Sequence, residues 1–176
     1  PREFDREKAL IQARDFFWQH GYEGTSMSDL VEVLGIASAR IYKAFGSKEA
    51  LFREAVIHYE ENEGGFAIHA LQQANIKDAI SQLFQDAIKL YTQNNHSYGC
   101  MVVSSASVLS QENQGLLDWM KQQRIERGQS LVKRFKQAKA EGQLLEHADP
   151  EILGQYYGLV LHGLSAQARD GYSEQM

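Results

Sequence analysis

Four basic side chains lie close together in residues 36–53 of a chain that is acidic as a whole. They are Arg40, Lys43, Lys48 and Arg53, and a single acidic residue in the same stretch leaves a local net charge of +3. All 176 residues together carry a net charge of −5, which disfavours general coating of a polyanion. Lysine and arginine bind phosphate, and arginine also donates to the edge of guanine. The pattern indicates a local contact with nucleic acid.

Two short helices and the start of a third are expected around these side chains, because the sequence gives start and stop signals for them. Ser26 caps the first helix, and Asp29 three residues later is the acidic partner of a capping box. Gly35 ends that helix, since glycine readily adopts the left-handed conformation beyond a helix end. Gly46 ends the second helix, and Ser47 caps a third. This is the outline of a helix-turn-helix, which places its second helix in the DNA major groove.

The second of these helices has two faces. Ala37 and Ile41 are expected to point inward, so that Ala39, Arg40 and Lys43 lie outside. Arg40 is expected to reach guanine or phosphate, and Ala39 a thymine methyl group. The predicted DNA contacts are Thr25, Ser26, Ser38, Ala39, Arg40, Tyr42, Lys43 and Lys48. The alternative is that Arg40 and Lys43 form only a solvated surface.

A preceding helix over residues 5–20 is expected to support this pair. Its apolar stripe consists of Leu10, Ala13, Phe16 and Phe17. Gly21 ends the helix. A three-helix domain is therefore predicted over residues 1–46.

The chain resembles the DNA-binding signature of the TetR/AcrR family of bacterial regulators in three stretches, which are residues 35–51, Gly21-Tyr22 and residues 25–30. The resemblance covers about the first 55 residues. Gly46 stands where many members have proline, and Arg40 where threonine or serine is common. The resemblance implies an all-helical homodimer. It also implies that the C-terminal domain binds a small ligand that releases the protein from its operator.

The rest of the chain, residues 47–176, is predicted to be a second helical domain for effector binding and dimerisation, which makes the fold class all-α. Pro1 and Pro150 are the only prolines, so little interrupts long helices. The expected helices span 47–62, which links the two domains, and then 76–91, 100–109, 112–141 and 150–168. The segment 100–109 also suits a strand, because Val102 and Val103 are β-branched, but no partner strand is evident.

The helix over 150–168 is apolar over more than one stripe, which indicates burial on several sides. A partner subunit or a central place within one subunit would explain this pattern. The resemblance favours a dimer, with Tyr156, Tyr157, Val160, Leu161 and Leu164 at its interface. The chain starts without methionine and stops at Met176 before another helix is established. We therefore expect a fragment that lacks part of the dimer surface.

The predicted effector site is a cavity between helices, lined by apolar groups and a few polar ones. Its candidates are Phe66, Tyr91, Cys100, Met101, Ser104, Trp119, Met120 and Tyr156. Each of them also suits ordinary core packing. Aromatic and methionine side chains favour a hydrophobic or aromatic effector over a sugar. Arg124 and Arg127 interrupt an apolar helix face, where they would pair with an acidic ligand, bridge subunits or face solvent.

Cys100 suggests a second kind of switch. It follows Gly99 at an expected helix start, where the helix dipole lowers a thiol pKa and favours the reactive thiolate. Some regulators that resemble this chain respond to oxidants or electrophiles through cysteine. The alternative is a small buried residue in the core.

The sequence predicts no catalysis, metal or cofactor. It contains no glycine-rich phosphate loop, no nucleophile elbow and no His-Glu-x-x-His pattern, and the stretch from His58 to Glu61 lacks a second histidine. No segment has the length of a membrane span or the pattern of a signal peptide. One cysteine excludes an intramolecular disulfide and fits a bacterial cytoplasm. The expected partners are double-stranded operator DNA, a second copy of the chain and a small effector. A DNA-binding protein without an effector is the remaining alternative.

Overall fold

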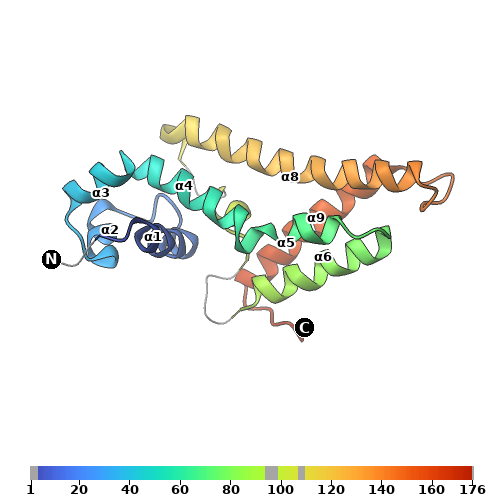
Figure 1. The fold of residues 1–176 in the computed structure, drawn as a ribbon, viewed down its shortest axis with the longest axis horizontal. Coiled ribbons are helices and arrows are strands. Elements are labelled where there is room, and N and C mark those ends of the chain that lie inside the picture. The colour runs from blue at the N-terminus through green and yellow to red at the C-terminus, as the bar shows by residue number, and fades with distance from the viewer. Residues whose placement is uncertain (1–3, 94–98, 107–109, 176) are drawn as a thin grey trace.

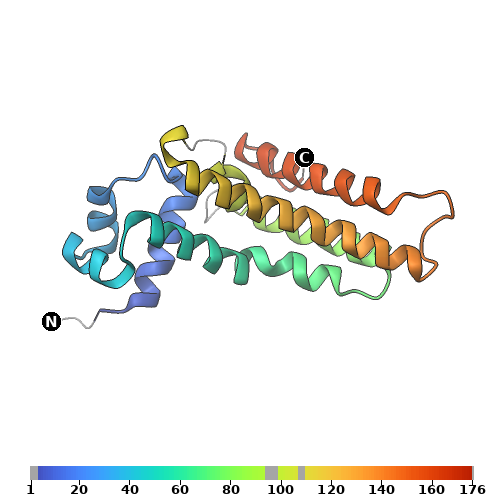
Figure 2. The same cartoon turned by 90° about the horizontal axis from the view of Figure 1, so that it is seen from above.

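The computed structural model describes residues 4–93, 99–106 and 110–175, and every regular element in these ranges is a helix, which confirms the all-α fold class. The α-helices are α1 (Arg6–His20), α2 (Met27–Leu34), α3 (Ser38–Phe45), α4 (Lys48–Glu61), α5 (Phe66–Leu71), α6 (Ile76–Tyr91), α7 (Met101–Ala106), α8 (Gln114–Ala140) and α9 (Pro150–Arg169). Short 3-10 helices, η1 (Glu63–Gly65) and η2 (Gln111–Asn113), precede α5 and α8. Helices α1 to α3 gather at one end of an elongated molecule (Figures 1 and 2).

The local signals at the helix ends are confirmed. The Ser26 hydroxyl accepts from the Asp29 amide while the Asp29 carboxylate accepts from the Ser26 amide, which is a complete capping box. Gly35 has φ 63° and ψ 28°, the left-handed conformation predicted for it. Ser47 accepts from the Ala50 amide and so caps α4. Asp149 caps α9 ahead of Pro150.

Several differences from prediction lie in the middle of the chain. Helix α5 was not predicted, because a six-residue helix between two loops carries little periodicity. The apolar pattern of residues 112–141 places Leu117 on the inner side of α8, but Leu116 is the buried residue and Leu117 is only half-buried. The predicted helix over 100–109 is present from Met101 to Ala106, and residues 107–109 lie outside the described residues. Residues 94–97, whose polar sequence is expected to interrupt the helical pattern, also lie outside them. No described helix combines the length and hydropathy needed to cross a bilayer.

One apolar core joins the three N-terminal helices to the rest of the molecule. Phe17 of α1 meets Phe52 of α4 edge-on, with ring centroids 5.1 Å apart. The next residue of α1, Trp18, meets Tyr59 of α4, about two turns beyond Phe52, with ring centroids 4.8 Å apart. The same cluster continues through Cys100 into α7 and α8. The two predicted domains, 1–46 and 47–176, therefore share buried side chains.

A glycine allows α8 and α9 to approach closely. Gly154 is buried, and a Cβ placed there would lie 2.6 Å from the Cα of Val132. Near this contact Tyr157 stacks on Phe135 with ring centroids 5.4 Å apart. Arg134 on the same part of α8 donates to the carbonyls of Leu71, Gln73 and Ala74. The close α8–α9 contact and the hydrogen bonds from Arg134 to backbone carbonyls together hold this end of the molecule.

We expect Gly154→Ala to lower the free energy of unfolding by about 1–3 kcal/mol, because the added methyl group overpacks the contact with the α8 backbone. Gly158→Ala is the matched control one turn along, where the new Cβ would meet only Leu131 Cδ1 at 3.7 Å. The control should gain up to about 1 kcal/mol from helix propensity. Urea denaturation followed by circular dichroism measures both. Equal effects at the two positions would contradict the close-approach explanation.

Candidate functional site

Helix α3 is held by its apolar residues and exposes its polar ones. Ile41 and Phe45 are buried in the shared core. The side chains of Ser38, Ala39, Arg40, Tyr42 and Lys43 are exposed, as the sequence predicts for a DNA-reading face. The prediction for Ala37 is wrong: it is exposed, because it is the extended N-cap residue of α3 and not part of its inner face.

The two predicted DNA contacts at the start of α2, Thr25 and Ser26, differ in their exposure. Ser26 is exposed, and its hydroxyl donates to Asp29 while it accepts from the Asp29 amide. Thr25 is fully buried, and its Oγ1 donates to the Gly21 carbonyl at 2.7 Å. A buried hydroxyl whose proton already has an acceptor is not placed to donate to phosphate. The structure therefore gives Thr25 a role in closing the α1–α2 turn and removes it from the candidate interface.

Lys48 lies at the edge of this surface, beside the turn between α1 and α2. Its Nζ is 4.2 Å from the centre of the Tyr22 ring. Partial burial lowers the pKa of Lys48, while the nearby carboxylates of Glu23 and Asp29 act in the opposite direction. The guanidinium of Arg40, on α3 itself, lies 5.7 Å from the centre of the Phe4 ring. Each of these two cations therefore lies near an aromatic ring.

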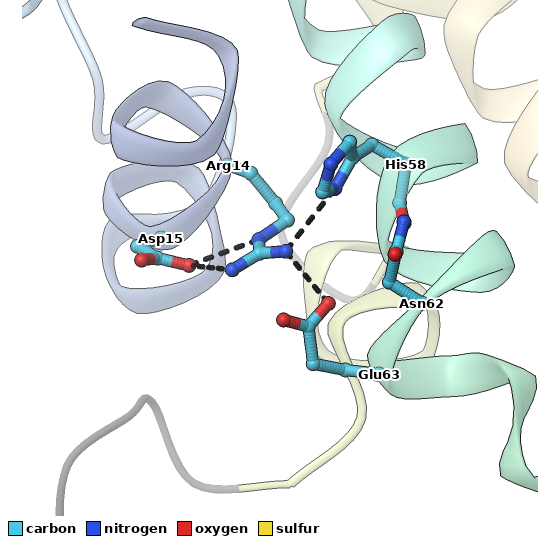
Figure 3. Close-up of polar contacts among 5 residues, drawn as sticks. All are labelled: Arg14, Asp15, His58, Asn62 and Glu63. Carbon is cyan, nitrogen blue, oxygen red and sulfur yellow. Dashed lines mark hydrogen bonds and ion pairs between the residues drawn. The ribbon is translucent and has the colours of Figure 1, made fainter. Parts of the chain in front are cut away.

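Two polar clusters connect the three N-terminal helices to the body. In the first, Arg14 of α1 is buried and its Nη1 donates to Glu63 of η1 at 2.6 Å (Figure 3). The same nitrogen lies 3.1 Å from Nδ1 of His58, and the other side of the guanidinium contacts Asp15. Arg14 therefore ties α1 to the end of α4, where the chain turns into α5.

The second cluster ties the α1–α2 turn to the start of α8. Glu23 accepts from the amide and hydroxyl of Ser110 and from the Asn113 side chain. The Ser110 amide is the main reason that the pKa of Glu23 lies below its usual value. A further contact links α4 to α8, because the guanidinium of Arg53 lies 4.8 Å from the centre of the Trp119 ring. Sequence reasoning missed both clusters, since their partners are far apart in the chain.

A cavity of about 1300 Å³ lies among α5 to α9 and the end of α4. It brings together three of the predicted effector contacts: Phe66, Tyr91 and Cys100. The others do not line it. Met101 and Met120 are fully buried, Ser104 donates to the Cys100 carbonyl, Trp119 lies under Arg53, and Tyr156 is exposed. The wall also contains Glu60, Leu161 and His162, which sequence reasoning missed.

The Cys100 thiol contacts two polar side chains at this cavity. Its Sγ lies 3.0 Å from Nη1 of Arg127 and 3.5 Å from the Tyr59 hydroxyl. Burial raises the pKa of the thiol, but the Arg127 charge, the Tyr59 hydroxyl and the Val103 amide outweigh it, so the pKa lies below its ordinary value. Ser165 on α9 accepts from the Cys100 amide. The Cys100 thiol is therefore buried, and its contacts lower its pKa.

The predicted dimer residues on α9 divide between two faces. Tyr156 is exposed, together with Ile152 at 64% and Leu159 at 70%, a large apolar surface for a single helix. Tyr157, Val160, Leu161 and Leu164 are only partly exposed, and Leu161 and Leu164 pack on the shared core. An interface through this helix would therefore centre on Tyr156, Ile152 and Leu159.

A capped helix-turn-helix with an exposed basic second helix, on an all-helical body, defines a DNA-binding regulator. Residues 10–55 match the family described as bacterial regulatory proteins, tetR family. The chain is 30% identical to the HTH-type transcriptional repressor ComR of Escherichia coli (strain K12), over 98% of this chain and 83% of that protein. It is 29% identical to the uncharacterized regulator YezE of Bacillus subtilis (strain 168), over 88% and 81%.

A solved structure extends this likeness to the whole fold. It contains a cysteine mutant of the TetR family regulator CifR in complex with 26-bp double-strand operator DNA. The likeness covers 99% of this chain and 92% of that one, with 35% identity and a TM-score of 0.93. The chain therefore belongs to the TetR family of transcriptional regulators.

Glu63→Gln tests the contact between α1 and the end of α4. We expect the variant to lose about 1–3 kcal/mol of unfolding free energy, because the buried guanidinium of Arg14 loses a charged acceptor but keeps Asp15. Glu54→Gln is the matched control, since its ion pair with Arg6 is exposed and should contribute about 0–1 kcal/mol. Urea denaturation of both variants measures the difference. A loss at position 54 as large as that at position 63 would contradict this ranking.

Proposed function

We propose that this regulator is a repressor that binds a palindromic operator as a homodimer and is released by a small hydrophobic or aromatic effector. The observation that carries the proposal is α3, whose apolar residues are buried while Ser38, Ala39, Arg40, Tyr42 and Lys43 are exposed on a locally basic surface. ComR is named as a repressor, and CifR is seen on its operator. Both support the proposal, which involves no catalytic step, metal or cofactor.

The proposed DNA contacts follow from the exposed side chains. Arg40 reads a guanine edge or phosphate, Ala39 contacts a thymine methyl group, and Lys43 binds phosphate. Ser26 and Lys48 flank α3 and add phosphate contacts. Because the chain as a whole is acidic, these few groups determine the affinity.

A dimer would supply two reading helices. The exposed apolar residues Ile152, Tyr156 and Leu159 of α9 form its proposed centre, since exposed apolar area of this kind marks interaction surfaces. A twofold axis there makes the operator palindromic, with reading helices roughly 34 Å apart or a multiple of that distance.

Effector release is proposed to act through α4. This helix shares a core with α1, and its last turn contributes Glu60 to the cavity wall. A ligand against Phe66 and Tyr91 would shift α4 or α8 and, through Arg14 and Glu23, the three N-terminal helices. A coupling free energy of about 1–3 kcal/mol between the two sites suffices for regulation.

Arg40→Ala tests the assignment of the reading helix. We expect operator affinity to fall by about 1–3 kcal/mol at fixed salt, because a base-edge or phosphate contact is lost. Fluorescence anisotropy with an operator selected from random duplexes measures it. Lys77→Ala is the control, an exposed cation on α6 far from α3, and should leave the affinity unchanged. Unchanged affinity in Arg40→Ala would show that α3 does not read DNA.

Cys100 favours a second candidate function, a repressor switched by electrophiles or oxidants. Its lowered thiol pKa and its place in the cavity wall are the observations that support this candidate. The thiolate would add to the double bond of an electrophile such as N-ethylmaleimide, forming a C–S bond while solvent protonates the carbon.

Cys100→Ser separates the two candidates. If the switch is Cys100, we expect the untreated variant to bind operator like wild type and to stay bound after N-ethylmaleimide or peroxide. The low thiol pKa further predicts that wild-type alkylation rises with pH through a midpoint below that of ordinary cysteine. Anisotropy and mass spectrometry follow release and modification. Release of the treated variant at the wild-type rate would exclude Cys100 as the switch.

A further inference from the structure

Helix α8 presents two arginines, one turn apart, to the wall of the cavity. They are Arg124 and Arg127, and His162 of α9 lies at the same wall. Partial burial lowers the pKa of His162, and the positive charges of Arg127 and Arg124 lower it further. Both arginines therefore act on the same region of the cavity. The apolar part of the wall includes Phe66, Leu83, Val102, Val103, Leu131 and Leu161.

The two arginines differ in their partners. Arg127 contacts the Cys100 sulfur at 3.0 Å and lies 3.9 Å from the Glu60 carboxylate. Within the residues that the structure describes, Arg124 has no ion pair, and its Nη1 is shielded from solvent without a hydrogen-bond partner. A buried guanidinium N–H without an acceptor costs free energy, more so because the group is charged. Arg124 is thus a cation held at the cavity without a counter-charge.

We propose that the cavity binds an organic anion, a carboxylate joined to an apolar body, and that Arg124 binds the carboxylate. The inference rests on the proposed function, since it names the chemical class of the effector. A guanidinium pairs with a carboxylate through two parallel hydrogen bonds, and rotation about the terminal torsions of Arg124 brings its nitrogens to the ligand. The apolar body lies against Phe66 and Tyr91, whose rings meet edge-on at 6.2 Å.

Other classes of ligand fit this wall less well. A cationic effector would face two arginines, with Glu60 as the nearby acid already beside Arg127. A neutral apolar effector would leave Arg124 without an acceptor. Glu126 of the same helix also lines the cavity, but its side chain is exposed and already accepts from Gln122. The charge of this region therefore selects an anion.

Matched acids and amides test the proposal without DNA. Octanoate, decanoate and 4-phenylbutyrate are compared with their primary amides by isothermal titration into the 176-residue chain. At least one carboxylate should bind about tenfold or more tightly than its amide. Arg124→Gln should abolish that preference. Lys121→Gln, an exposed cation one turn away on α8 and outside the cavity wall, should retain it.

Each other outcome overturns the proposal. Carboxylates that bind no better than their amides exclude an anion site, whatever the variants do. If Arg124→Gln still binds carboxylates more tightly than their amides, and both variants melt at the wild-type temperature, another residue binds the carboxylate. A change of subunit association in Arg124→Gln alone, seen by analytical ultracentrifugation, would make Arg124 a bridge between subunits.

Parallel operator titrations separate this inference from the proposed function. Operator binding without any preference for carboxylates means that only the effector class is wrong. A carboxylate preference in a chain that binds no operator means that the proposed function is wrong and the site is real.

Discussion

The packing of α4 is the constraint on which the rest of the structure depends. One face of this helix is buried along its whole length, through Leu51, Phe52, Ala55, Val56 and Tyr59. Phe52 packs on Phe17 of α1, and the Tyr59 hydroxyl reaches the Cys100 sulfur beside the cavity. Because protein interiors are close-packed, a helix so enclosed moves only if its neighbours move with it. The DNA-reading surface and the cavity are therefore mechanically joined.

Polar contacts also connect the three N-terminal helices to α4 and α8. The shared apolar core resists separation of the helices, and hydrogen bonds to charged groups add a dependence on distance and angle. Arg14 fixes the middle of α1 to the end of α4, and Glu23 fixes the α1–α2 turn to the start of α8. Two attachment points on different helices restrain the rotation of the three N-terminal helices. Relative motion of α4 and α8 would therefore reach α3 as a change of orientation.

Local chemistry explains which parts were predictable from sequence. The capping box of Ser26 and the left-handed Gly35 involve residues within one turn, so their patterns determine their structure. Thr25 was misassigned because its acceptor, the Gly21 carbonyl, appears only once the turn closes. The cavity joins residues from six helices, and no periodicity predicts which of the residues on α8 face α9. For that reason Met101 and Met120 were expected at the cavity, although they are packed in the core.

Arg127 links the two ways in which the cavity could sense a signal. Its charge is the largest influence that favours the Cys100 thiolate, and it also acts on His162 beside Arg124. An anion bound at Arg124 would stand in the same positive field as the thiolate, and two negative charges there repel each other. By linkage, such an anion would raise the pKa of the thiol. Formation of the thiolate would lower the affinity for the anion by the same factor. An occupied cavity would then protect Cys100 from electrophiles both sterically and electrostatically.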